Sequence, residues 1–192
     1  MKLILASASP RRAEILRSAG IAFETLAVHV DESRLGSEPP VALVRRLAEA
    51  KARAAAQRIA ADEPGIVVGA DTEVVVDGTV LGKPASAEDA RAMLRLLSGR
   101  AHDVITGLAL LRIPGSEARV EHESTRVTFA PISEEEIASY VASGEPFDKA
   151  GGYAIQGRAG RYITRVEGSH SNVVGLPLAR LYRLLREFGW PA

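Results

Sequence analysis

Apolar and polar positions alternate along the 192-residue chain in two rhythms, one typical of strands and one typical of helices. Short apolar runs at 2–6 and 66–70 have the length and composition of buried strands. Between them, residues 10–19 and 41–62 place apolar side chains three or four positions apart, which is the spacing of an amphipathic helix. Strands that alternate with helices are typical of a sheet covered by helices, so the pattern predicts an α/β fold.

Capping and turn residues set the limits of the predicted elements. Ser9 and Pro10 suit the N-cap and the first position of the helix 10–19, and Gly20 suits its C-terminal stop. Asp77-Gly78 predicts a two-residue hairpin turn. The other expected elements are strands at 23–30, within 65–84 with a break at Asp71, at 101–113 and at 122–132, helices at 86–97, 133–143 and 176–188, and a glycine-rich segment at 151–168. Because no repeat or linker separates them, we expect a single domain over residues 1–192.

Composition narrows the classes of partner and chemistry. Lys plus Arg equals Asp plus Glu, 24 each, so no overall positive field attracts nucleic acid, and we expect no such partner. The absence of cysteine excludes disulfides, zinc–thiolate sites and thiol nucleophiles. No apolar run approaches the about 18 residues of a membrane span, and the run 3–6 is too short for a signal peptide. We therefore expect a cytoplasmic protein that does not enter a membrane.

Two arginines in the first turn of the helix 10–19 need an explanation. A helix N-terminus carries a partial positive charge, so Arg11 and Arg12 are each unfavourable there by roughly 0.3–1 kcal/mol. A bound anion would remove this penalty, because the helix N-terminus and the guanidinium groups would then both face negative charge. The pattern therefore indicates an anion site at the Ser-Pro-Arg-Arg turn.

Lys51 and Asp71 each allow two interpretations. Lys51 interrupts the apolar face of the helix 41–62. Either its stem packs while the ammonium reaches water, or the ammonium points at an anion in a cleft. Asp71 follows a buried apolar run, where a carboxylate either accepts backbone hydrogen bonds in a turn or serves as a metal ligand or base.

Other candidates are weaker when taken alone. Glu32 with Asp31 follows the strand expected at 23–30, and Lys83 sits in a Gly-Lys-Pro turn, but loops commonly carry such residues. The four histidines have no metal-ligand spacing, and Ser7 lies in no recognisable nucleophile motif.

The segment 143–157 is rich in glycine and carries polar and aromatic side chains. Tyr153 is able to stack on a nucleobase, and Gln156 offers both a donor and an acceptor to a base edge. A purely structural turn-rich loop is the alternative. Together with the lysines and carboxylates above, the segment indicates a site for a phosphorylated nucleoside and a hard divalent metal.

A series of short motifs runs in order along the whole chain. They are SASPRR at 7–12, DE at 31–32, AEAKA at 48–52, GADT at 69–72, LGKP at 81–84, SGEPFDKAGGYAIQG at 143–157 and GSHSNVVGLP at 168–177. This series resembles the Maf family of nucleoside triphosphate pyrophosphatases. The resemblance implies an α/β/α sandwich of the inosine-triphosphatase-like type, with a long mixed twisted sheet, a cleft between two lobes and a homodimeric state. It also implies hydrolysis of a nucleoside triphosphate to its monophosphate and pyrophosphate.

The same resemblance assigns roles to residues. It makes Asp71 the proton acceptor and, with Glu32, a ligand of Mg²⁺ or Mn²⁺, and it places Lys51, Lys83 and Arg12 around the triphosphate. Ser7 and Arg11 belong to the same turn as Arg12 and are expected to contact the substrate. Arg12, Thr72 and Gln156 match positions that separate substrate classes, and GADT with AIQG resembles the branch that acts on dTTP and UTP.

Three alternatives stay open at this point. A nucleotide-binding regulator of cell division and septum formation, without turnover, would be expected to lack Asp71 or another of the charged set. A nucleic-acid-binding module would use arginines at 158, 161 and 165 with Tyr153 and Tyr162. A housecleaning role on modified pyrimidine triphosphates would share the mechanism and differ only in substrate.

Overall fold

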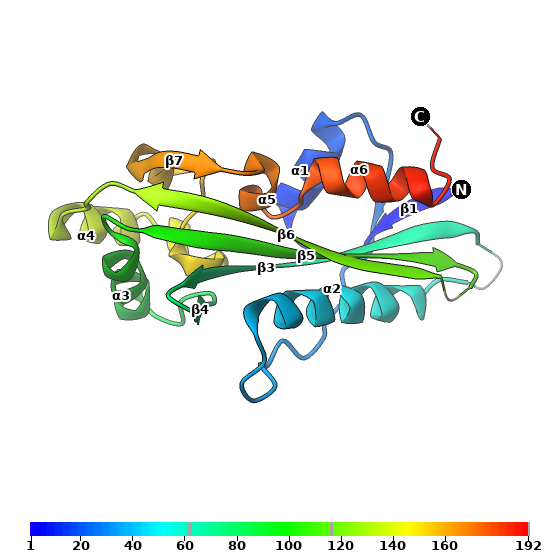
Figure 1. Ribbon diagram of the computed structural model, residues 1–192, viewed down its shortest axis with the longest axis horizontal. Coiled ribbons are helices and arrows are strands. Elements are labelled where there is room, and N and C mark those ends of the chain that lie inside the picture. The colour runs from blue at the N-terminus through cyan, green and yellow to red at the C-terminus, as the bar shows by residue number, and fades with distance from the viewer. Residues whose placement is uncertain (61–62, 116, 192) are drawn as a thin grey trace. The chain divides into compact units, whose positions relative to one another are not determined.

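The computed structural model describes residues 1–60, 63–115 and 117–191 (Figure 1). Its strands are β1 (Lys2–Leu5), β2 (Glu24–Thr25), β3 (Gly65–Val76), β4 (Thr79–Leu81), β5 (Ala101–Ile113), β6 (Ala118–Phe129) and β7 (Ile163–Glu167). Its helices are α1 (Pro10–Ser18), α2 (Pro40–Ala56), α3 (Ala87–Leu97), α4 (Glu134–Ala142), α5 (His170–Val174) and α6 (Leu178–Glu187), with 3₁₀ turns η1 (Glu145–Asp148), η2 (Ala150–Gly152) and η3 (Arg158–Tyr162).

The strands form one mixed sheet. In the described residues its order is β2-β1-β3-β5-β6-β7, with β4 beside β3. β1 is parallel to β2 and β3, whereas β4 is antiparallel to β3 and β7 is antiparallel to β6. The sheet and its helices confirm the predicted α/β fold with a long mixed sheet. None of the helices in the described part of the chain has the length and apolar character needed to cross a bilayer.

The chain divides into two compact units. The first contains Met1–Asp71, Thr106–Glu123 and Gly175–Ala192, and the second contains Thr72–Ile105 and Ser124–Val174. Strands β3, β5 and β6 each contribute residues to both units.

Alternating side chains of the strands build two cores in the first unit. Leu3 and Leu5 of β1 belong to a cluster with residues of α1 and α6, whereas Ile4 and Ala6 belong to a cluster with alanines of α2. Figure 1 shows the same arrangement, with α1 and α6 on one face of these strands and α2 on the other. Because neighbouring side chains of a strand point to opposite faces, one short apolar strand serves both layers.

Two glycines allow the backbone of α2 to lie directly on the strands. A Cβ atom at Gly69 of β3 would stand 2.1 Å from the carbonyl oxygen of Ala48, and one at Gly107 of β5 would stand 2.0 Å from that of Val44. Any other residue would therefore push the helix away from the sheet. This close contact fixes the position of the α2 backbone, and so the point from which each of its side chains extends.

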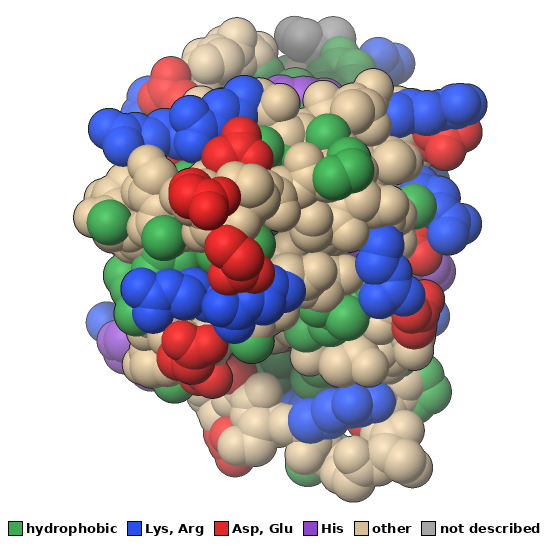
Figure 2. Space-filling model, turned by 90° about the vertical axis from the view of Figure 1, so that its left-hand side faces the viewer, with side chains coloured by type: hydrophobic (Ala, Val, Ile, Leu, Met, Phe, Trp, Pro, Cys, Tyr) green, Lys and Arg blue, Asp and Glu red, His purple; other side chains and the backbone are tan. Residues whose placement is uncertain are grey.

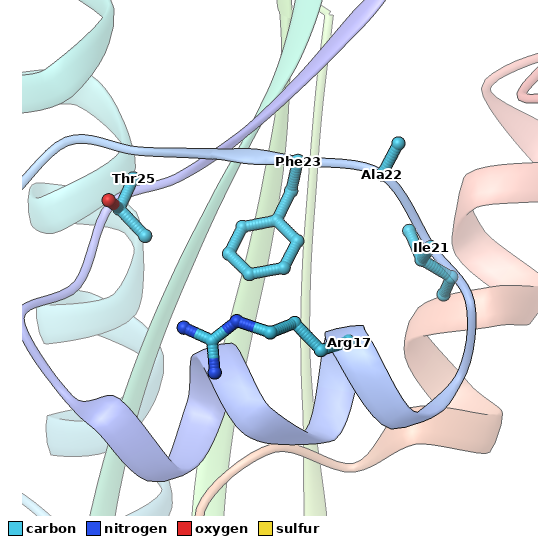
Figure 3. A pocket seen from close by; sticks show the side chains of 5 residues that line it. All are labelled: Arg17, Ile21, Ala22, Phe23 and Thr25. Atoms are coloured by element: carbon cyan, nitrogen blue, oxygen red, sulfur yellow. The ribbon is translucent and has the colours of Figure 1, made fainter.

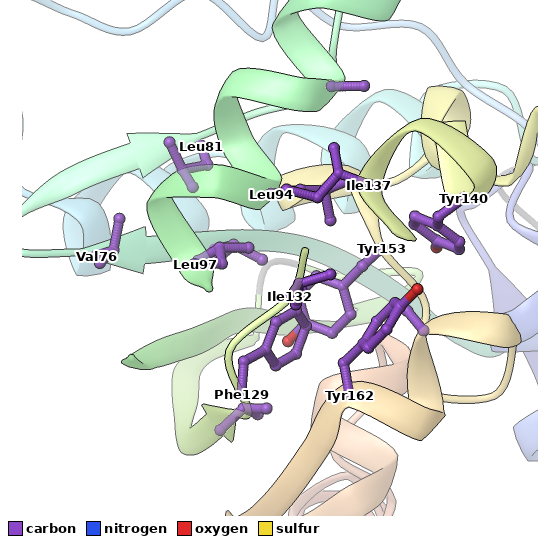
Figure 4. Close-up of a cluster of buried hydrophobic side chains, with 14 of the residues drawn as sticks. Val76, Leu81, Leu94, Leu97, Phe129, Ile132, Ile137, Tyr140, Tyr153 and Tyr162 are labelled. Atoms are coloured by element: carbon purple, nitrogen blue, oxygen red, sulfur yellow. The ribbon is translucent and has the colours of Figure 1, made fainter. Parts of the chain in front are cut away.

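The core of the second unit is more aromatic (Figure 4). His102 and Tyr153 are buried in it, and the His102 Nε2 atom lies 2.7 Å from the Tyr153 hydroxyl. Both rings also meet the edge of Phe129, at centroid distances of 5.1 and 4.8 Å. The interpretation of Tyr153 as a nucleobase-stacking residue is therefore wrong, because its ring is enclosed by the core.

Most locally determined predictions are confirmed. Gly20, at φ +68°, ends α1 by donating its N–H to the Arg17 carbonyl at 2.9 Å, and Ile21 donates to Leu16 at 3.1 Å. Asp77 and Gly78 form the predicted hairpin turn, since Val76 pairs with Thr79 across it. The serines that open α3 and α4 accept capping hydrogen bonds, and α4 has the reciprocal capping box of Ser133 and Glu136.

The strand predicted at 23–30 is reduced to the two residues of β2. Its partner β1 ends at Leu5, which pairs with Thr25, and the Leu5 carbonyl accepts the last bond from the Leu26 N–H at 3.0 Å. Among the residues that the structure describes, no strand pairs with the chain beyond that point of β2.

The helix predicted at 41–62 ends at Ala56. The N–H of Arg58 bonds the carbonyl of Ala55, which turns the chain out of the helix, and residues 61–62 lie outside the described residues. Two further elements, β7 and α5, are absent from the sequence prediction. β7 falls within the segment 151–168, which is predicted as a glycine-rich segment, and α5 falls between that segment and the helix predicted at 176–188.

We predict that His102 makes the second unit sensitive to acid. Burial lowers the pKa of His102 to about 4, below the 6.5 of an exposed histidine. Between these values the unfolded chain binds the proton more readily, so stability falls as the pH falls. From pH 7.5 to pH 5 the His102 contribution is a loss of about 2 kcal/mol.

Urea denaturation of the natural chain and of His102→Gln at both pH values measures this difference. The natural chain should lose about 2 kcal/mol more than the variant, which keeps a hydrogen-bonding group opposite Tyr153 but does not titrate. Equal losses in the two proteins would show that His102 is not the group that responds.

Candidate active site

Lys51 stands between two carboxylates in the first unit. Its Nζ atom lies 2.6 Å from Asp71 Oδ1 and 2.6 Å from Glu32 Oε1. The lysine and aspartate side chains are 12% and 9% exposed, whereas Glu32 is 53% exposed. The ammonium thus joins a buried carboxylate to one at the surface, and the interpretation in which it reaches water is wrong.

Asp71 lies inside a continuous strand. The sequence predicts a break there, but β3 runs from Gly65 to Val76 through this position. A carboxylate is tolerated in the strand because Lys51 neutralises it from the facing helix α2. The prediction of a break is therefore wrong, and so is the interpretation of Asp71 as a turn residue.

The second carboxylate oxygen of Asp71 is not used by Lys51. Oδ2 is buried and has no hydrogen-bond partner among the described residues. A buried polar atom without a partner costs about 1–3 kcal/mol, and more when it is charged. Such an atom is suited to accept a proton or to bind a cation.

Arg12 is fixed beside this carboxylate by two hydrogen bonds. Its Nε donates to the Gly175 carbonyl at 2.8 Å, and its Nη1 donates to Ser7 Oγ at 3.1 Å. Burial lowers the pKa of the Arg12 guanidinium, and the charge of Asp71 partly offsets this effect. Arg12 is thus a cation with a set orientation.

The start of α1 is organised by Ser7 rather than by Ser9. Ser9 occupies the predicted N-cap position, but its side chain makes no capping hydrogen bond in the described structure. Instead its N–H donates to Ser7 Oγ at 3.2 Å. Ser7 is nearly buried and accepts two hydrogen bonds, so it shapes the turn that carries the half-buried Arg11 and Arg12.

The predicted site residues fall into two sets. The first unit contains Ser7, Arg11, Arg12, Glu32, Lys51 and Asp71, and the second contains Thr72, Lys83 and Gln156. In the second unit, Thr72 is half-buried in β3, Lys83 is exposed after β4, and Gln156 is exposed between η2 and η3.

Glu145 is a residue that sequence reasoning missed. One of its carboxylate oxygens accepts the Tyr140 hydroxyl at 2.9 Å, and the other accepts the Arg158 N–H at 3.1 Å. A Cβ atom at Gly157 would lie 2.0 Å from the same carboxylate. Glu145 therefore holds the turn that carries Gln156. The glycine at position 157 is the one mark of this contact in the sequence, because a larger residue there would collide with the Glu145 carboxylate.

The carboxylates of Glu32 and Asp71 are the candidates for a metal. In the part of the chain that is described, no group of three or more histidine, aspartate or glutamate side chains is placed to hold one. Mg²⁺ is usually bound by one or two carboxylates, with water and substrate phosphates as its other ligands. The open Asp71 Oδ2 and the half-exposed Glu32 fit that mode of binding.

A surface pocket of about 390 Å³ lies elsewhere in the first unit (Figure 3). It is lined by Arg17, Ile21, Ala22, Phe23 and Thr25, none of which is a predicted site residue. The Arg17 guanidinium lies 6.0 Å from the centre of the Phe23 ring and also binds Glu14 at 2.8 Å. The arginine of this pocket is therefore already paired.

Nucleic acid binding through stacked tyrosines has no support in the structure. Tyr153 and Tyr162, the aromatic residues of that hypothesis, are both buried in the core of the second unit. On the face that Figure 2 presents, basic and acidic side chains are interspersed. Rings enclosed in a core are not available to stack on bases.

Comparison with known proteins gives the family. The model of the family described as Maf-like protein matches residues 2–188, and the chain belongs to this family. A relative from Symbiobacterium thermophilum, named dTTP/UTP pyrophosphatase, is 54% identical over 191 residues, which cover 99% of this chain and 95% of the relative. A relative from Koribacter versatilis with the same name is 52% identical over 189 residues, which cover 98% of this chain and 95% of the relative.

A solved structure agrees at the level of the fold. The Ham1 protein of Staphylococcus aureus matches 97% of this chain and 99% of its own with a TM-score of 0.52 and 13% sequence identity. At this identity the likeness concerns the fold alone.

We predict that Lys51→Met destabilises the first unit. The change removes the ammonium that contacts both Asp71 and Glu32 and leaves the buried Asp71 carboxylate without its ion-pair partner at 2.6 Å, which should lower the free energy of unfolding by about 2–4 kcal/mol. Arg53→Met is the matched control on the same helix, because Arg53 forms an exposed pair with Glu49, and its loss should cost less than about 0.5 kcal/mol. Denaturant unfolding measures both. Similar small losses in the two variants would contradict a structural role for the Lys51 pairs.

Proposed function

We propose that this chain is a nucleoside triphosphate pyrophosphatase that hydrolyses dTTP and UTP to the monophosphate and pyrophosphate. The observation that carries the proposal is the Lys51 ammonium held between Glu32 and Asp71, with the second oxygen of Asp71 left open. Support also comes from the relatives named dTTP/UTP pyrophosphatase at 54% and 52% identity.

In this proposal Asp71 is the general base. Attack on the α-phosphorus requires a water molecule that loses its proton as the new bond forms, and Asp71 Oδ2 accepts that proton. Lys51 holds Oδ1 at 2.6 Å, which orients the carboxylate and leaves Oδ2 as its second oxygen for the proton.

The cations of the site stabilise the departing pyrophosphate. Negative charge grows on the leaving group in the transition state, and preorganised donors lower the barrier most when they need not move. Arg12 meets this condition, because Ser7 and Gly175 hold its guanidinium in place. The N-terminal N–H groups of α1, Arg11 and Lys83 supply further positive charge in the proposal.

A divalent metal completes the proposal. Glu32 and Asp71 would hold Mg²⁺ or Mn²⁺, which supplies charge neutralisation and Lewis-acid polarisation of phosphate oxygens when bound. The remaining ligands would be water and phosphate oxygens of the substrate.

Base selection is assigned to Thr72 and Gln156. Thymine and uracil present the same hydrogen-bonding edge, with an acceptor beside a donor, and a glutamine amide complements that pair. Modified pyrimidine triphosphates with the same edge are included in the proposal. We further propose that the chain acts as a cytoplasmic homodimer without nucleic acid, and sedimentation of the purified protein tests the dimer.

We predict that Asp71→Asn abolishes turnover. The amide keeps the shape of the side chain but is not a base, so pyrophosphate release from dTTP and UTP with Mg²⁺ should fall by about 10³-fold. Asp77→Asn is the matched control, because Asp77 lies exposed in the hairpin turn, where asparagine is equally suited. Nucleotide binding by the Asp71 variant, measured by calorimetry, should persist. Full activity in that variant would eliminate the proposed base.

We predict that Gln156→Ala changes base preference rather than chemistry. Loss of a paired donor and acceptor should reduce the preference for dTTP and UTP over other nucleotides by about 10–100-fold in kcat/KM. The rate on the poorest substrate should change little, and Gln57→Ala, at the exposed end of α2, should change neither. An equal loss on all nucleotides would show that Gln156 does not read the base.

A further inference from the structure

Glu32 lies in a segment without regular secondary structure between β2 and α2, yet its carboxylate stands at hydrogen-bonding distance from Lys51. We propose that Arg46 and Glu38 are positioning residues that hold this segment so that Glu32 faces Lys51. The inference rests on the proposed function, in which Glu32 serves the reaction.

Arg46 of α2 forms hydrogen bonds to this segment. Its Nε and Nη2 atoms donate to the two carboxylate oxygens of Glu38, both at 2.8 Å. The same Nη2 also donates to the carbonyl of Ser33 at 3.0 Å. Ser33 directly follows Glu32, so Arg46 fixes the backbone one residue away from the functional side chain.

This pair differs from the exposed ion pairs of the same helix. The Glu38 side chain is only 11% exposed and that of Arg46 is 29% exposed, whereas Arg53 and Glu49 are 52% and 37% exposed. A two-point contact between a guanidinium and a carboxylate sets both distance and angle. A lysine in place of Arg46 has a single ammonium and does not reproduce that geometry.

Hydrogen bonds between residues of the segment also hold its shape. Arg34 donates from Nε and Nη2 to the Glu38 carbonyl at 2.9 and 2.7 Å. At the other end, Asp31 Oδ1 accepts the Ser33 N–H at 2.9 Å. Glu32 therefore lies within a turn that the Asp31–Ser33 bond closes, and Arg46 anchors the Ser33 end of that turn.

Helix α2 carries both Lys51, which contacts the Glu32 carboxylate, and Arg46, which binds the loop that contains Glu32. Arg46 and Lys51 are five positions apart on α2, or about 7–8 Å along its axis. The glycine contacts at Gly69 and Gly107 fix α2 against the strands of the same unit. Release of Arg46 would free Glu32 from Lys51 and leave Asp71 in place, because Asp71 belongs to β3.

The test uses Arg46→Met, Glu38→Gln and the exchanged pair Arg46→Glu with Glu38→Arg, and Arg53→Met is the control. In the single variants, amide hydrogens of residues 31–38 should exchange at least tenfold faster, and the Mg²⁺ concentration for half-maximal rate should rise at least tenfold. KM for dTTP should change less than threefold, because Arg12 and Lys51 are intact. The exchanged pair should recover most of both effects, and the control should show neither.

Two results would overturn the inference. One is unchanged exchange in 31–38 and unchanged Mg²⁺ dependence in Glu38→Gln, the milder variant. The other is a loss of global stability with no change in Mg²⁺ dependence, which would make the pair merely structural. If the natural chain releases no pyrophosphate, the proposed function fails, and the exchange rates with Mn²⁺ binding measured by electron paramagnetic resonance still decide whether Arg46 holds Glu32.

Discussion

The site depends on one interaction, the single ammonium of Lys51 shared by the carboxylates of Glu32 and Asp71. It allows an aspartate to lie inside a buried strand, and it brings a surface loop to the same point. Its geometry follows from backbone packing, because α2 lies on β3 and β5 only where Gly69 and Gly107 leave room. The alanine-rich sequence of α2 has the same cause, since larger side chains would lift the helix and carry Lys51 away from Asp71.

Two effects offset the unfavourable placement of Arg11 and Arg12 at the positive N-terminus of α1. An anion at the helix N-terminus is the one that the sequence indicates. The structure adds another within the chain, since Asp71 offsets the effect of burial on the pKa of Arg12, and Ser7 and Gly175 accept its N–H groups. The guanidinium is therefore already placed before a polyphosphate arrives. In the proposed reaction this lowers the cost of reorganisation in the transition state.

Features that depend on neighbours in the sequence are predictable from it. The end of α1 at Gly20, the Asp77-Gly78 hairpin and the capping box of α4 each rest on residues within a few positions of one another. Features that depend on distant partners are not. Asp71 looks like a strand end until Lys51, 20 positions away, is seen to neutralise it. Tyr153 looks like a stacking residue until His102, 51 positions away, is seen to hold it in the core.

The candidate site shows the same limit. Charge and position in the sequence mark Lys51, Asp71 and Arg12 as candidates, and the resemblance to the Maf family adds Glu32 and the roles. The structure places all four in the first unit. Glu38 and Glu145 are not predicted from the sequence, because nothing near an acidic loop residue in the sequence indicates its partner. The structure shows what each of them binds, because Glu38 pairs with Arg46, and Glu145 accepts the Tyr140 hydroxyl and the Arg158 N–H.

In the proposed reaction, water attacks the α-phosphorus of a pyrimidine nucleoside triphosphate. Hydrolysis of dTTP in water enriched in oxygen-18, followed by mass spectrometry of both products, tests it most directly. Attack at the α-phosphorus should place one labelled oxygen in the monophosphate and none in the pyrophosphate. Label in the pyrophosphate, or release of inorganic phosphate as the first product, would contradict it.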